Sequence, residues 1–262
     1  MFKFLPMSSQ RRSIPTEDRI SILPDPVLCH ILSFLPTKLS AATSILSKRW
    51  KPLWLSVLIL HFDDQAFQDF ISFRHFVSSA FLSRDITIPL QSFHLKCSKE
   101  SSLQPHDINR FVYTAVQRGI ENLYLEISST IYLKLPPSIF SCRTLVVLHL
   151  KGLKVNDLSH VAVDFPLLKT LHLSSVLVER IEYFVKLLSG CPILEELQAL
   201  YIRVLNIEWL GQEMSVLLEK IQSLPNLIRA NITKSHSSLM LLSTMLCKKE
   251  ARVLRAEVVR IL

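Results

Sequence analysis

The chain has 262 residues, of which 49% are hydrophobic, and a formal net charge of +8. This composition excludes a disordered chain and suffices for one sizeable core plus a small module. No apolar run approaches the roughly eighteen residues that a membrane helix needs, and the start of the chain lacks a cleavage site for secretion. The five cysteines are widely spaced without a C-x-x-C pair, which favours reduced thiols. We therefore expect an intracellular protein of the nucleus and/or cytoplasm with no membrane partner.

The positive charge is concentrated at the two ends of the chain. Residues 1–60 hold 8 Lys and Arg against 3 Asp and Glu, residues 61–200 hold 13 against 14, and residues 201–262 hold 9 against 5. A nucleic-acid surface would need a continuous basic stripe with interleaved aromatic residues, and the middle of the chain lacks one. We therefore expect no nucleic-acid partner.

The first predicted elements are short amphipathic helices between residues 18 and 54. One helix face carries apolar residues at the spacing i, i+3, i+4 and i+7, namely Leu28, Ile31, Leu32 and Leu35. Asp25 is expected to cap this helix and Pro26 to occupy its first position. About forty residues cannot bury so many Leu, Ile and Trp by themselves, so the surplus should face a partner or the rest of the chain.

One apolar pattern, L-x-x-L-x-L, recurs along the rest of the chain. Its central residues are Leu60, Phe93, Leu123, Leu148, Leu171, Leu197 and Ala230, at steps of 33, 30, 25, 23, 26 and 33 residues. This spacing is typical of leucine-rich repeats of roughly 20–29 residues, with some enlarged units. In the last thirty residues, 253–258 offer one further unit.

Each repeat is expected to contain a strand whose two Leu of L-x-L point inward while their neighbours point outward. Stacked units then share one continuous core. Helical spacing between the strands predicts helices over residues 65–82, 107–117 and 181–188. The expected fold class is α/β, with a small helical module followed by a solenoid that has a parallel sheet on one face and helices on the other.

The outward residues at the centre of the strands form a polar and aromatic row: His61, His94, Tyr124, His149, His172, Gln198 and Asn231. Parallel strands lie about 4.8 Å apart, so neighbouring members of the row should meet. Such a row suits recognition of a partner, although ordinary solvent-facing strand residues would look similar. The candidate target-binding residues are Tyr124, His149, His172, Glu196 and Gln198. Because histidines titrate near neutral pH, binding is expected to change between about pH 6 and 8.

No catalytic site is evident in the sequence. It has no phosphate-binding loop, no G-x-S-x-G and no H-E-x-x-H, and it has only four glycines. Glu195 and Glu196 should point to opposite faces of a strand, so they cannot share acid–base chemistry. No third ligand accompanies His149 and His172, so we expect neither a metal nor a cofactor. These observations favour a binding protein over an enzyme.

The segment from Asp18 to Trp54 resembles an F-box, closely the plant type. The matching stretches are Asp18–Ser21, Leu23–Asp25, Ile31–Ser33, Leu35–Lys38, Thr43–Ser44, Leu46–Trp50 and Leu53–Trp54. The family usually has an acidic residue where this chain has Pro26, and a proline suits a helix start. The resemblance implies that residues 16–56, after a mobile tail over 1–15, dock onto the Skp-family adaptor of a cullin–RING ubiquitin ligase. The adaptor-binding residues it implies are Leu23, Pro24, Leu28, Ile31, Leu32, Leu35, Leu46, Arg49, Trp50 and Trp54.

An F-box followed by such repeats is similar to the plant F-box/leucine-rich-repeat proteins, especially those with a C-terminal FBD domain. The stretches FHLKC (93–97), AVQRGIENLYLEI (115–127) and GCPILEEL (190–197) carry this likeness, whereas the last thirty residues are not similar to FBD. The likeness implies that about seven repeats over residues 57–262 hold a protein target for ubiquitin transfer within an SCF-type ligase. The alternatives are an interaction module that acts outside any ligase and a shortened non-functional family member. A further alternative is recognition assisted by a small ligand, but receptors of that kind have larger solenoids than about seven repeats.

Overall fold

The computed structural model of the protein describes residues 19–20, 22–98, 104–128, 132–205 and 210–234. The predicted mobile tail and the further unit at residues 253–258 lie outside these residues.

Short helices form the N-terminal module: α1 (Asp25–Ser33), α2 (Thr37–Ala42), the 3₁₀ turn η1 (Thr43–Ile45) and α3 (Trp50–Leu55). Their shared core consists of Leu28, Leu32, Trp50, Leu53 and Val57. Helix α1 begins one residue earlier than predicted, after Pro24, so Asp25 does not cap it. The Asp25 carboxylate instead accepts hydrogen bonds of 2.8 and 2.5 Å from Arg49. A charged donor makes a stronger partner for a carboxylate than a backbone N–H does.

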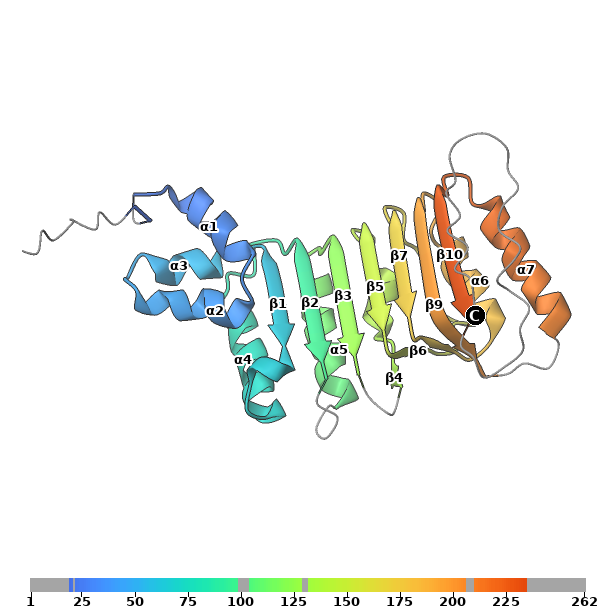
Figure 1. Cartoon of the computed structure of the whole chain (residues 1–262), viewed down its shortest axis with the longest axis horizontal. Coiled ribbons are helices and arrows are strands. Elements are labelled where there is room, and N and C mark those ends of the chain that lie inside the picture. Colours follow the sequence, from blue (N-terminus) through green and yellow to red (C-terminus); the bar gives the residue numbers. More distant parts are fainter. Residues whose placement is uncertain (1–18, 21, 99–103, 129–131, 206–209, 235–262) are drawn as a thin grey trace, which may run out of the picture.

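Seven parallel strands of the described chain form the main sheet and follow one another in sequence order (Figure 1). They are β1 (Ile59–Asp63), β2 (Ser92–Cys97), β3 (Asn122–Ile127), β5 (Val147–Lys151), β7 (Thr170–Ser174), β9 (Glu196–Val204) and β10 (Arg229–Lys234). The predicted central residues of the repeats, from Leu60 to Ala230, are aligned across all of these strands. The predicted parallel solenoid is therefore confirmed.

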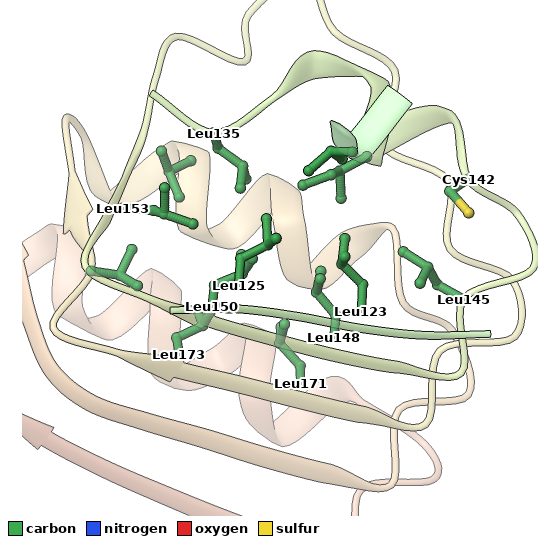
Figure 2. Packing of buried hydrophobic residues seen from close by; sticks show 14 of the residues in the cluster. Leu123, Leu125, Leu135, Cys142, Leu145, Leu148, Leu150, Leu153, Leu171 and Leu173 are labelled. Atoms are coloured by element: carbon green, nitrogen blue, oxygen red, sulfur yellow. The ribbon is translucent and has the colours of Figure 1, made fainter. Parts of the chain in front are cut away.

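Inward-pointing leucines fill the interior, as Figure 2 shows for the middle repeats. Leu148 and Leu171 rise from neighbouring strands, and Leu135 and Leu153 come from the opposite side of the interior. All four are at most 2% exposed, within one hydrophobic cluster that runs through the repeats. Close packing of this kind makes each unit depend on its neighbours.

Along the chain, helices connect successive strands of the main sheet. They are η2 (Asp64–Ala66), α4 (Phe70–Leu82), α5 (Pro105–Val116), η3 (Pro137–Ser141), α6 (Ile181–Ser189) and α7 (Leu210–Ser223). The helices predicted over 107–117 and 181–188 are confirmed as α5 and α6. The helix predicted from residue 65 begins only at Phe70, because the Asp69 side chain caps it by accepting from the Ser72 N–H at 2.7 Å.

A second, short parallel sheet was not predicted. It consists of β4 (Leu133–Lys134), β6 (Leu153–Val155) and β8 (Leu177–Val178), followed by the second half of β9. The chain reaches it from the main sheet through a corner with positive φ, four positions after the central residue of the repeat. The corner residues are Gly152 (φ 71°), Ser175 (φ 50°) and Tyr201 (φ 57°).

The N-terminal module is fastened to the first repeat. Arg84, which is 6% exposed, donates hydrogen bonds of 2.6–2.7 Å to the carbonyl oxygens of Trp54, Leu55 and Val57. Burial and the neighbouring Arg118 lower the pKa of Arg84 to about 10, which leaves it charged at neutral pH. On α2, Thr37 Oγ1 accepts a hydrogen bond of 2.8 Å from the His61 N–H of β1. The module therefore covers the first edge of the main sheet (Figure 1).

Candidate functional site

The predicted adaptor-binding residues divide into a buried group and an exposed group. Leu28, Leu32 and Trp50 are 0%, 1% and 8% exposed and lie in the core of the N-terminal module. In the folded module these three side chains position the helices and do not offer a contact surface. Pro24, Ile31 and Leu46 are exposed, and the partly buried members are Leu23, Leu35, Arg49 and Trp54.

The same module exposes a set of large apolar side chains: Ile20, Ile22, Val27, Ile31, Phe34, Leu39, Ile45 and Leu46. Phe34 and Ile45 are 74% and 86% exposed. The adaptor-binding residues that the F-box resemblance implies include Ile31 and Leu46 but none of the others. The available signal was an apolar residue off the periodic face of α1, such as Phe34 at the end of this helix. Large exposed apolar side chains gathered in one small module favour an interaction surface on that module.

The outward row of the main sheet is arranged as predicted, with His61, His94, Tyr124, His149 and His172 in register on neighbouring strands. The rings of His61 and His94 stack at 3.9 Å between centroids, and those of His94 and Tyr124 do the same. Tyr124 and His149 lie 5.9 Å apart, and His149 and His172 lie 5.8 Å apart. Gln198 and Asn231 continue the row on β9 and β10.

Burial keeps several of these rings uncharged. Burial lowers the pKa of His61 and of His149. Burial, followed by electrostatic repulsion from His61 and from His149 two strands away, lowers the pKa of His94 to about 3. It also raises the pKa of Tyr124. The three histidines therefore protonate below the usual value of about 6.5. The change in binding expected between pH 6 and 8 moves to lower pH for these residues, because part of each ring is removed from water.

Charged residues flank the row in opposite pairs, each joining neighbouring strands: Lys96–Asp63 at 3.0 Å, Lys151–Glu126 at 3.6 Å and Arg229–Glu196 at 3.3 Å. Glu196 Oε1 also lies 3.7 Å from His172 Nε2, beyond hydrogen-bond distance. The exposed face of the main sheet thus has balanced charge, although the chain as a whole is at +8. It presents neutral rings and amides that can pack against and hydrogen-bond a partner.

Two further structural findings concern chemistry and membranes. Among the residues that the structure describes, no group of three or more His, Cys, Asp and Glu could hold a metal ion. No helix in the described ranges is long and apolar enough to cross a membrane.

Two family models match the chain. The F-box domain model matches residues 20–62, and the model described as "FBD-associated F-box protein At5g56370, LRR repeats" matches residues 108–260. The chain belongs to the plant F-box/leucine-rich-repeat family. The repeat match of this F-box protein extends to residue 260, beyond the stretches that carry the resemblance in the sequence.

Curated relatives of this F-box protein come from Arabidopsis thaliana. "F-box/FBD/LRR-repeat protein At4g00160" is 39% identical over 230 residues, which cover 86% of this chain and 48% of the relative. "Putative F-box/LRR-repeat protein At5g41840" is 36% identical over 241 residues, covering 83% and 43%. "FBD-associated F-box protein At4g10400" is 39% identical over 188 residues, covering 69% and 44%. The chain thus spans about half the length of the curated relatives it matches.

Proposed function

We propose that this chain is a substrate-receptor subunit of an SCF-type cullin–RING ubiquitin ligase. Its F-box binds a Skp-family adaptor, and through it the cullin, while the repeats bind a protein target that other subunits ubiquitinate. The receptor performs no catalysis, uses no cofactor and works in the nucleus or the cytoplasm. The match to the F-box family supports the first interaction, and the match to the repeat family supports the second.

The observation that carries the adaptor interaction is the exposed apolar set of the F-box. Phe34 and Leu46 belong to it and lie outside the module's core. Large apolar anchors at an interface centre lose at least about 2 kcal/mol on truncation, which is roughly thirtyfold in affinity. The buried residues Leu28, Leu32 and Trp50 act indirectly, by keeping these anchors in place.

The test is binding to a plant Skp adaptor by pull-down and calorimetry. Phe34→Ala with Leu46→Ala should weaken binding by about thirtyfold or more while the helices stay folded. Ile71→Ala with Leu82→Ala, equally exposed on α4, is the matched control and should bind normally. Leu32→Ala with Trp50→Ala should also abolish binding, through loss of the F-box core, and leave the repeats folded. A wild-type chain that binds no plant Skp adaptor would contradict the ligase role and favour an interaction module outside any ligase.

For target binding we propose the exposed face of the main sheet, through Tyr124, His149, His172, Glu196 and Gln198. Rings on rigid strands lose little conformational freedom when they bind, so they make good anchors. Because the flanking charges are already paired, binding there should change little with salt. The test is target recovery by affinity purification and mass spectrometry. His149→Ala with His172→Ala should lose targets, whereas Arg110→Ala with Tyr113→Ala, exposed on α5, should keep them. The reverse pattern would exclude this face.

A further inference from the structure

The second sheet presents a row of side chains outward. Lys134, Lys154, Leu177 and Arg203 are aligned across β4, β6, β8 and β9. Their chain neighbours alternate with them and pack into the core, as Val155, Val178 and Val204 do. With strands about 4.8 Å apart, the row from Lys134 to Arg203 is about 14 Å long.

The charge of this row differs from that of the main sheet face. It holds three cations, and the nearby acid Glu179 pairs with Lys154 at 3.3 Å. Lys134 and Arg203 are exposed, and within the described residues neither has a carboxylate at ion-pair distance. By contrast, each flanking cation of the main sheet face has a partner. Counting only the residues that the structure describes, the outward side of the second sheet therefore carries more positive than negative charge.

An exposed tyrosine lies close in sequence to Arg203, the last residue of the row. Tyr201 precedes Arg203 by two positions on β9 and is 53% exposed, and Leu205, two positions beyond Arg203, is exposed as well. Tyr201 holds φ at 57°, where a bulky residue is strained. The equivalent corners of the two preceding repeats have Gly152 and Ser175. The fold thus maintains a strained, exposed aromatic residue two positions before Arg203, whose guanidinium has no carboxylate at ion-pair distance among the described residues.

We propose that the outward face of the second sheet, formed by Lys134, Lys154, Leu177, Tyr201, Arg203 and Leu205, is a docking surface for an acidic protein segment with apolar side chains. An extended segment places side chains on one side about every 7 Å, so about five residues crossing the strands reach all three cations. Tyr201 and Leu205 receive the apolar side chains, and Tyr and Arg are favoured interface anchors. The surface does not depend on adaptor binding or on the main sheet face.

The size of the row favours a protein segment over a nucleic acid. A nucleic-acid strand needs a continuous basic groove along its backbone with several stacking rings. Here three cations are interrupted by Leu177, one of them is paired with Glu179, and a single tyrosine lies at the end. Leu177 and Leu205 instead match an occupant that has apolar side chains between its acids.

Fluorescence anisotropy with the full chain tests the proposal. The probe is a fluorescein-labelled peptide in which glutamates alternate with leucine and serine, and the same peptide with glutamine for glutamate is the neutral comparison. The acidic peptide should bind more tightly than the neutral one, and its affinity should fall between about 50 and 200 mM salt. An oligothymidylate that binds as tightly as the acidic peptide, or equal binding of both peptides, would overturn the proposal.

Two variants locate the site. Each exposed ion pair is worth up to about fivefold in affinity, and charge reversal adds repulsion, so Lys134→Glu with Arg203→Glu should weaken binding by about twentyfold or more. The matched control is Lys48→Glu with Lys51→Glu, which changes the net charge by the same amount at exposed positions of the F-box and should bind the acidic peptide normally. Tyr201→Gly should weaken binding yet raise the melting temperature, because it removes an anchor and relieves the strain. Unchanged binding in the Lys134→Glu with Arg203→Glu variant would refute the site. If this charge-reversal variant does not fold, the measurement is repeated with Lys134→Gln and Arg203→Gln.

Discussion

The corner at Gly152 gives a stringent test of how tightly the repeats pack. A methyl group on Gly152 would lie 1.7 Å from the carbonyl oxygen of Ile127, at the end of β3. Because the obstacle is backbone, it cannot rotate away, and β3 or β6 must shift. Alanine at φ 71° alone costs about 1–2 kcal/mol. A shift would also disturb the hydrogen bond from Gly152 N–H to the Ser174 oxygen and the packing around it. We expect Gly152→Ala to lower the free energy of unfolding by about 3–5 kcal/mol.

Gly119 is the matched control. It has φ 68°, but a methyl group there would meet nothing within 4 Å, so Gly119→Ala should cost only about 1–2 kcal/mol. Urea unfolding followed by circular dichroism measures both, as a shift of the midpoint at constant slope. The backbone conformation is common to the two sites, so the difference isolates the clash. Equal shifts for the two variants would refute the view that neighbouring repeats meet at this corner without spare room.

Three further predictions concern the core, the ring row and the junction. Leu171→Ala should cost about 2–5 kcal/mol by leaving a cavity, whereas Leu167→Ala, half exposed, should cost under about 1 kcal/mol in the same urea assay. The folded pKa of His94 is about 3, below its unfolded value, so its stabilising contribution is complete above about pH 6.5 and is lost as pH falls toward 3. Melting curves should show this decline in stability, which should stay below about 1.4 kcal/mol per pH unit because water screens the half-buried ring. The variant His94→Gln should make the decline smaller. Arg84→Met leaves three carbonyl oxygens without their charged donor and should cost about 3 kcal/mol and expose residues 54–58 to protease, unlike Arg143→Met at an exposed ion pair.

The main sheet could be predicted because one rule fixes it. In L-x-x-L-x-L the alternation of a strand decides which side each residue faces, and the repeat length decides which strand is its neighbour. His149 and His172 could therefore be placed side by side from their distance to the central leucines. The lowered pKa of His149 could not be predicted, because the degree of burial depends on how neighbouring side chains pack around the ring.

The second sheet was missed although the sequence carries a signal for it. Apolar residues recur five and seven positions after the central leucine, as Leu153 with Val155, Val176 with Val178, and Ile202 with Val204. Their runs are only two or three residues long, shorter than a typical strand, so alternation alone gives a weak signal. The left-handed corner that separates them from the main strand is marked by glycine in only one of the three repeats.

Sequence reasoning about the F-box identified the apolar surplus but not its division. Helical periodicity groups Leu28, Ile31 and Leu32 on one face, yet Ile31 is exposed while the two leucines are buried. Whether a residue of such a face meets the module's own core or a partner depends on how short helices cross, which periodicity does not encode. In the nine-residue helix α1 only Leu28 and Leu32 are buried, whereas five residues are buried in α6, which has the same length.

The apolar residues that the small F-box cannot bury by itself face two ways, toward the first repeat and toward solvent. On the side of the repeats, Trp54 packs against the cores of both the module and the repeats. There Arg84 also donates a hydrogen bond to the carbonyl oxygen of Trp54 near the end of α3. Toward solvent, Phe34 and Ile45 remain uncovered. Because the junction is buried and the two terminal nitrogens of Arg84 bind three of its carbonyl oxygens, the F-box and the first repeat should move as one body. The exposed apolar set is then held at a fixed distance from both sheet faces. If the proposed receptor role holds, the number of repeats between the F-box and the bound target should set how far that target lies from the adaptor.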